Sequence, residues 1–184
     1  MLRASSIPNC ICVLRILLVV PLVQALLAGR YDWALALIFL AGFSDGLDGY
    51  LAKTFDWRSR LGGILDPLAD KLLLVSVFVT LAYLGLTPLW LAVVVIVRDV
   101  VIVSGAVAYN GLIGKVMPEP TAISKLNTGF QLLYILLVIA HQAFAWPSFT
   151  AVLVVGAGVL ITSVVSGLDY VLRWGAKALA AGRS

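Results

Sequence analysis

The chain has 184 residues, of which 62% are apolar and 12% are charged, and its formal net charge is +4. A soluble domain of this size would carry far less apolar sequence, so the composition indicates a membrane protein. The small positive charge does not indicate nucleic-acid binding, although a basic face would attract anionic lipid headgroups.

Six apolar segments follow one another along the chain, each close to the roughly 20 residues that a helix needs to cross a bilayer. They cover about residues 10–29, 33–52, 62–84, 89–110, 124–145 and 149–172. These segments are too long, and too rich in Leu, Ala and Gly, for membrane β-strands. The sequence therefore predicts an all-α, polytopic bundle of six transmembrane helices. Little chain remains outside them, so residues 1–184 are expected to form a single membrane domain.

Lysine and arginine lie unevenly in the loops between these segments. If the N-terminus is cytoplasmic, Arg30 alone falls on the far side. The cytoplasmic side then receives Arg3, Lys53, Arg58, Arg60, Lys115, Lys125, Arg173, Lys177 and Arg183. Positive residues favour the cytoplasmic side of a membrane, so both termini are predicted to be cytoplasmic.

Two pairs of aspartates lie where the second segment ends and the third begins. Asp45 and Asp48 are three residues apart, and Asp66 and Asp70 are four apart. Residues at these spacings share one face of a helix. A carboxylate inside a membrane helix costs several kcal/mol unless it faces a polar cavity or a cation. The four aspartates are therefore expected to lie at similar depth and to bind cations.

Oxygen ligands alone favour a hard cation such as Mg²⁺, Mn²⁺ or Ca²⁺. Four carboxylates suffice for two such ions roughly 4 Å apart, as in two-metal phosphoryl-transfer sites. Small residues beside the acids, among them Gly49, Ala52 and Gly62, would let a nucleotide approach the backbone. The alternative for each glycine is ordinary helix packing.

Three cationic side chains lie inside or at the ends of other segments. Arg15 is in the first, Arg98 precedes Asp99 in the fourth, and Lys125 opens the fifth. Such groups would bind substrate phosphates, arginine in a bidentate manner. For Arg98 the alternative is an ion pair with Asp99 or with another helix.

The spacing of the aspartates and small residues resembles the signature of the CDP-alcohol phosphotransferase (phosphatidyltransferase) family. The eight fixed positions of the signature fall at Asp45, Asp48, Gly49, Ala52, Lys53, Gly62, Asp66 and Asp70, and seven of the eight match. One position departs from the family pattern, which has Arg where this chain has Lys53. Lysine keeps the charge but loses the planar fork, so its phosphate contact is expected to be weaker or rearranged.

The resemblance implies transfer of a phosphoryl-alcohol group from a CDP-linked donor to an acceptor hydroxyl, with release of CMP. It implies that Asp45, Asp48, Asp66 and Asp70 bind two Mg²⁺ or Mn²⁺ ions and that Asp70 is also the catalytic base. Gly49, Ala52, Lys53 and Gly62 would line the CMP and diphosphate site. The family's bundle agrees with the predicted topology, and relatives are often homodimers.

Other stretches bear on the acceptor. The segment from Asn9 to Arg15 resembles both the phosphatidylglycerophosphate synthases and the cardiolipin synthases of the family. The segments around Arg98 and Lys125 resemble the cardiolipin synthases more closely. The expected substrates are CDP-diacylglycerol and phosphatidylglycerol, and the alternative acceptor is glycerol 3-phosphate. Asn9, Arg15, Arg98 and Lys125 are the expected substrate contacts.

The resemblance also implies a location in a bacterial or mitochondrial inner membrane, with the site facing the cytoplasm or matrix. Two rival functions stay open. Intramembrane acids also mark ion or metabolite transporters, but here they gather at one face and no inverted repeat is visible. A non-catalytic lipid-binding relative would bind metal without releasing CMP.

Overall fold

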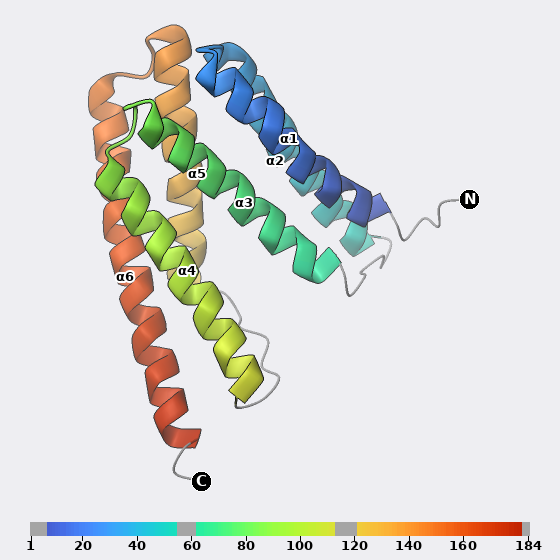
Figure 1. The fold of residues 1–184 in the computed structure, drawn as a ribbon, viewed down its shortest axis with the longest axis vertical. Coiled ribbons are helices and arrows are strands. Elements are labelled where there is room, and N and C mark those ends of the chain that lie inside the picture. The colour runs from blue at the N-terminus through green and yellow to red at the C-terminus, as the bar shows by residue number, and fades with distance from the viewer. Residues whose placement is uncertain (1–6, 55–61, 113–120, 182–184) are drawn as a thin grey trace. The chain divides into compact units, whose positions relative to one another are not determined.

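The computed structural model describes the backbone of residues 7–54, 62–112 and 121–181, and the side chains of residues 13–44, 69–105 and 121–172. Over these residues the chain forms six α-helices and no strand (Figure 1), which confirms the all-α prediction. The helices are α1 (Ile7–Leu27), α2 (Tyr31–Thr54), α3 (Gly62–Tyr83), α4 (Leu89–Leu112), α5 (Ala122–Phe144) and α6 (Phe149–Ala181).

The helix ends lie close to the ends of the six apolar segments, except at the C-terminal end of α6. The last apolar segment stops at Leu172, before Arg173, whereas α6 continues to Ala181. The continuous apolar run ends at Leu172, but the residues that follow it are mainly Ala, Leu and Lys, which have high helix propensity. The helix therefore extends beyond the segment that hydropathy alone defines.

Two of the helix ends are closed by glycines in the left-handed conformation. Gly29 has φ of 70° and Gly85 has φ of 72°. Behind Gly29, the Arg30 amide donates to the Ala25 carbonyl at 2.9 Å, and behind Gly85 the Leu86 amide donates to the Leu81 carbonyl at 2.9 Å. These are Schellman closures, which satisfy the last carbonyls of α1 and α3 and turn the chain sharply.

The chain divides into two compact units, and each is described by itself. Unit 1 comprises residues 1–87 and 135–148. In it, α1 packs against both α2 and α3. Because α1, α2 and α3 run in alternating directions, the start of α1, the end of α2 and the start of α3 lie at the same end of unit 1 (Figure 1). Its core includes Leu22, Leu26, Val77, Phe78 and Leu81, all fully buried.

Unit 2 comprises residues 88–134 and 149–184, so α5 contributes to both units. Here α4 packs against α6. The two helices approach closely at Gly105, where an added Cβ would lie 2.8 Å from Cε1 of Tyr170. The core of unit 2 combines apolar side chains such as Val95 and Val159 with the buried amide of Asn127.

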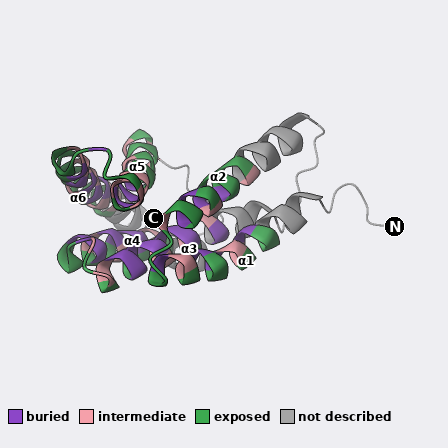
Figure 2. Ribbon diagram, turned by 90° about the horizontal axis from the view of Figure 1, so that it is seen from above, coloured by how far each residue is buried: buried purple, intermediate pink, exposed green. Residues whose placement is uncertain are grey.

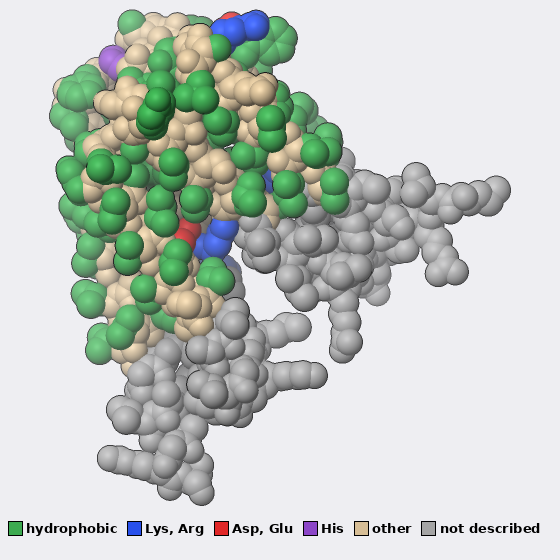
Figure 3. Space-filling model, in the orientation of Figure 1, with side chains coloured by type: hydrophobic (Ala, Val, Ile, Leu, Met, Phe, Trp, Pro, Cys, Tyr) green, Lys and Arg blue, Asp and Glu red, His purple; other side chains and the backbone are tan. Residues whose placement is uncertain are grey.

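Exposed residues occur along all the helices labelled in Figure 2. On the face shown in Figure 3, apolar side chains cover much of the surface of the described residues. Phe43, Val154 and Leu172 are each at least 65% exposed. Surfaces of this kind are unusual on soluble proteins and suit a lipid environment. Within the described residues, two helices are long and apolar enough to cross a membrane, namely Ala122–Phe144 and Phe149–Leu172. Shorter apolar stretches are Val13–Leu27 and Tyr31–Ser44.

Candidate active site

The residues of the signature lie at the shared end of unit 1, on the last turns of α2 and the first turns of α3. Asp45, Asp48, Gly49, Ala52 and Lys53 are in α2, and Gly62, Asp66 and Asp70 are in α3. Asn9 lies in the first turn of α1. Of these residues only Asp70 has a described side chain, so the predicted roles of the other side chains lie outside the described residues.

Asp70 forms an ion pair with Arg15, in which the Nη1 group of Arg15 donates to Oδ1 of Asp70. The two residues are 55 positions apart in the chain and join α1 to α3. Each lies eight residues into its helix, which is about 12 Å from the helix start at 1.5 Å per residue. Their equal depth at the same end of unit 1 explains why they meet.

The two partners differ strongly in exposure. The side chain of Arg15 is 2% exposed, whereas the side chain of Asp70 is 44% exposed. A buried guanidinium is costly unless a carboxylate compensates its charge. Arg15 therefore compensates the charge of the Asp70 carboxylate from the buried side of the pair, while the Asp70 side chain stays partly exposed.

The donor chemistry of this end of unit 1 suits a hard cation. The signature supplies carboxylate oxygens only, and Asp70 presents its carboxylate at the surface. Among the residues with described side chains, no group of three or more His, Cys, Asp or Glu gathers to hold a metal. Because only Asp70 of the four signature aspartates is among them, the two-metal site stays a prediction.

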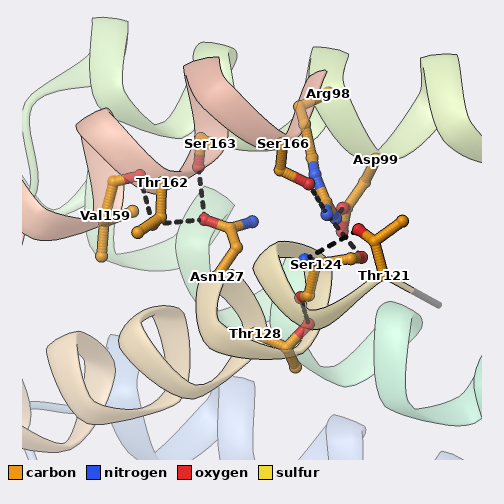
Figure 4. A network of polar contacts seen from close by, with 10 residues as sticks. All are labelled: Arg98, Asp99, Thr121, Ser124, Asn127, Thr128, Val159, Thr162, Ser163 and Ser166. Atoms are coloured by element: carbon orange, nitrogen blue, oxygen red, sulfur yellow. Dashed lines mark hydrogen bonds and ion pairs between the residues drawn. The ribbon is translucent and has the colours of Figure 1, made fainter. Parts of the chain in front are cut away.

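A second polar cluster lies inside unit 2 around Arg98, on α4 (Figure 4). Its Nη1 donates to Oδ1 of Asp99 at 2.6 Å, and its Nη2 donates to Oγ of Ser124 at 2.7 Å. The same Nη2 also donates to Oγ of Ser166 on α6. The side chains of Arg98 and Asp99 are only 4% and 6% exposed. The ion pair that the sequence allowed for Arg98 is therefore confirmed, and a substrate contact by Arg98 stays a prediction.

Asn127 makes a further link between α5 and α6 in unit 2 (Figure 4). Its Oδ1 accepts hydrogen bonds from the hydroxyls of Thr162 and Ser163, each at 2.9 Å. Asn127 is fully buried, and Ser163 is 1% exposed. Inside an apolar bundle such bonds fix the register of the two helices, because breaking them leaves buried polar groups without partners.

Lys125 lies at the N-terminal end of α5 and is exposed. Thr121 caps this helix, since its Oγ1 accepts the Ser124 amide at 3.3 Å. The adjacent Ser124 hydroxyl is the one that Arg98 binds. Lys125 thus directly follows the serine that Arg98 binds, and both lie in unit 2, whereas Arg15 and Asp70 meet in unit 1.

Sequence reasoning did not anticipate that Arg15 binds Asp70, nor that Ser124, Ser166 and Asn127 join the helices of unit 2. The signal for Arg15 was its depth, since it lies as far into α1 as Asp70 lies into α3. For the serines and Asn127 no comparable signal exists, because small polar residues at isolated positions of apolar helices have many other roles.

Comparison with known proteins gives a consistent result. The family model described as CDP-alcohol phosphatidyltransferase matches residues 5–168. A cardiolipin synthase (CMP-forming) / mitochondrial hydrolase fusion protein of Schizosaccharomyces pombe is 38% identical over 90% of this chain and 30% of its own length. The human cardiolipin synthase (CMP-forming) is 30% identical over 90% of this chain and 60% of its own length.

A probable phosphatidylglycerophosphate synthase of Mycobacterium tuberculosis is also similar, with 30% identity over 93% of this chain and 82% of its own length. The chain spans less than two thirds of the length of the yeast and human relatives. The family match covers most of the chain and agrees with the signature in α2 and α3. The chain therefore belongs to the CDP-alcohol phosphatidyltransferase family.

Proposed function

We propose that the protein transfers a phosphatidyl group from CDP-diacylglycerol to phosphatidylglycerol, forming cardiolipin and releasing CMP. The observation that carries this proposal is the exposed carboxylate of Asp70, held by the buried Arg15 at the end of unit 1 that bears the family signature. The similarity to cardiolipin synthases over 90% of the chain supports the choice of acceptor.

In this reaction the acceptor hydroxyl oxygen forms a bond to the β-phosphorus of the donor. The bond between that phosphorus and the bridging oxygen breaks, and the electron pair leaves with CMP. Asp70 accepts the proton of the attacking hydroxyl, which requires hydrogen-bond contact between the two oxygens. Arg15 acts through Asp70 as a positioning residue, since it fixes the orientation of the carboxylate.

Asp45, Asp48, Asp66 and Asp70 are the proposed ligands of two Mg²⁺ or Mn²⁺ ions. When bound, these ions would neutralise the charge of the diphosphate and make the acceptor hydroxyl more acidic. Gly49, Ala52, Lys53 and Gly62 are the proposed lining of the CMP and diphosphate site. Asn9, Arg98 and Lys125 are proposed contacts to the substrates.

The proposed setting is a membrane crossed six times, with both termini and the signature on the cytoplasmic or matrix side. The loop charges support this orientation. The exposed apolar side chains of α2 and α6 support contact with lipid tails. A homodimer is proposed because exposed small residues such as Ala36 and Gly42 on α2 permit close helix contacts.

The second candidate is phosphatidylglycerophosphate synthesis, with glycerol 3-phosphate as acceptor. The similarity to the mycobacterial protein favours this candidate, because the aligned region covers 82% of that protein but 60% of the human cardiolipin synthase. A phosphomonoester acceptor requires additional cationic contacts. Lys125 is exposed, whereas Arg98 is buried and bound to Asp99, Ser124 and Ser166.

The test is an assay of purified protein in detergent–lipid micelles with CDP-diacylglycerol, Mg²⁺ and one acceptor at a time. CMP release with phosphatidylglycerol, lost on chelation of the metal and restored by Mg²⁺, is the expected result. CMP release with glycerol 3-phosphate alone would support the second candidate. If neither acceptor supports CMP release at any metal concentration, both candidate functions are contradicted.

A further inference from the structure

Two apolar grooves run along the exposed face of α5, one on each side of Lys125 and Gly129. The first has a volume of about 320 Å³ and is lined by Ser124, Lys125, Thr128, Gly129 and Leu132. The second has a volume of about 470 Å³, shares Lys125 and Gly129, and is lined further by Ala122, Leu126, Phe130 and Leu133. Both grooves are shallow and open, and all of their lining residues belong to α5.

The grooves begin at a positively charged end of the helix. Lys125 is exposed at this end, and the capped N-terminus of α5 adds its dipole. The neighbouring hydroxyls already have partners, because Ser124 accepts from Arg98 and the exposed Thr128 donates to the Ser124 carbonyl. Lys125 is therefore the side chain at the start of both grooves that suits an anionic group.

Gly129 makes the grooves possible because it carries no side chain between them. It lies four residues after Lys125, so the two share one face of α5. A Cβ at Gly129 would meet nothing within 4 Å, which means that the space above it is open. Beyond Gly129 the lining is apolar, with Leu132 on one side and Leu133 on the other.

One cation with two apolar grooves that start beside it matches a lipid that has one phosphate and two acyl chains. We infer that the α5 grooves bind the acceptor phospholipid, with its phosphate on Lys125 and one acyl chain in each groove. This inference rests on the proposed function. A single phosphate diester matches the single charge of Lys125, whereas glycerol 3-phosphate has no acyl chain to occupy either groove.

The test fills the grooves without disturbing the core. Gly129→Leu places a side chain in open space, and alanine or leucine at this position also favours the helix. The KM for phosphatidylglycerol, measured as mole fraction in mixed micelles, is expected to rise about tenfold, as expected from losing the burial of about two methylene groups. Gly129→Ala is expected to give a smaller rise, and the KM for CDP-diacylglycerol is expected to stay within about twofold.

A matched control is Ala157→Leu, which enlarges an exposed small residue on α6 in the same unit and lines neither groove. It is expected to leave both KM values near those of the unaltered protein. Lys125→Ala should raise the KM for phosphatidylglycerol, and Lys125→Arg should restore most of it. A rise confined to the KM for CDP-diacylglycerol, or no change in Gly129→Leu, would overturn the inference.

A binding readout separates this inference from the proposed function. Native mass spectrometry of the purified protein with phosphatidylglycerol and zwitterionic phosphatidylcholine measures which lipid is retained. The unaltered protein is expected to retain phosphatidylglycerol preferentially. Lys125→Ala is expected to lose that preference, and Gly129→Leu is expected to retain less of both lipids. If no acceptor supports CMP release but lipid retention depends on Gly129 and Lys125 in this way, only the proposed function fails. If the unaltered protein and Gly129→Leu retain phosphatidylglycerol equally, the inference is overturned, whatever the activity of either protein.

Discussion

Each of the two units contains a buried arginine that binds an aspartate, and the two pairs are built differently. In unit 1, Arg15 and Asp70 come from separate helices, and the aspartate side chain is 44% exposed. In unit 2, Arg98 and Asp99 are adjacent in sequence, and both are buried. Arg98 also binds Ser124 and Ser166, so its donors are directed to its own unit.

The difference indicates different roles for the same pair of residue types. A carboxylate that is oriented by a buried cation and whose side chain is partly exposed can take part in chemistry. A carboxylate enclosed with its partner contributes to the arrangement of three helices. We therefore expect changes at Asp70 to affect turnover, and changes at Asp99 to affect mainly the free energy of unfolding.

The largest expected effect is on activity, in Asp70→Asn. The amide keeps the shape and a hydrogen-bond acceptor for Arg15 but cannot take a proton or ligate a cation well. The rate of CMP release is expected to fall by about 10²–10⁴-fold, the usual contribution of a general base. Steady-state CMP assays on folded protein check this value. An Asp70→Asn protein with full activity would remove Asp70 from the mechanism.

The next effect concerns stability, in Asp99→Asn. Removing the charge leaves the guanidinium of Arg98 buried without its counter-ion, and the free energy of unfolding is expected to fall by about 3 kcal/mol. Thermal unfolding in detergent measures the loss, and Asp32→Asn, an exposed acid on α2, serves as the control. A loss in Asp99→Asn no larger than in the control would show that the pair in unit 2 is not structural.

A smaller effect is expected in Arg15→Gln. Glutamine retains a hydrogen-bond donor, but the Asp70 carboxylate loses its fixed orientation and its compensating charge. Residues that position a ligand in this way typically contribute about 10–100-fold to activity or metal affinity. The measurement is CMP release as a function of Mg²⁺ concentration. Arg30→Gln is the matched control, because Arg30 is exposed and stacks over Trp33 at 5.2 Å.

The smallest effect is expected in Ser163→Ala. This change removes one of the two hydroxyls that donate to Asn127, and the second, from Thr162, remains. The free energy of unfolding is expected to fall by about 1 kcal/mol. Ser104→Ala on the exposed face of α4 removes only a bond to the Val101 carbonyl and should have no measurable effect. Equal losses in the two variants would argue against a special role for the Asn127 link.

The helices were predictable because each apolar segment is long and the loops contain Gly, Pro and charged residues. The extension of α6 to Ala181 was not predictable from hydropathy, because the apolar run stops at Leu172 while residues with high helix propensity continue. The signature was visible as spacing, but the partner of Asp70 was not, because pairing across 55 residues depends on how α1 and α3 pack. Likewise, the serine contacts of Arg98 depend on the register of α4, α5 and α6, which composition does not specify.

The most direct measurement of the central claim is the mass and stoichiometry of the lipid product. The unaltered protein is incubated with Mg²⁺, CDP-diacylglycerol and phosphatidylglycerol labelled in its headgroup glycerol. We predict cardiolipin that retains the intact label, with one CMP released per cardiolipin, and a loss of both products by the same factor in Asp70→Asn. Release of CMP without labelled cardiolipin, while glycerol 3-phosphate yields phosphatidylglycerophosphate, would contradict the account.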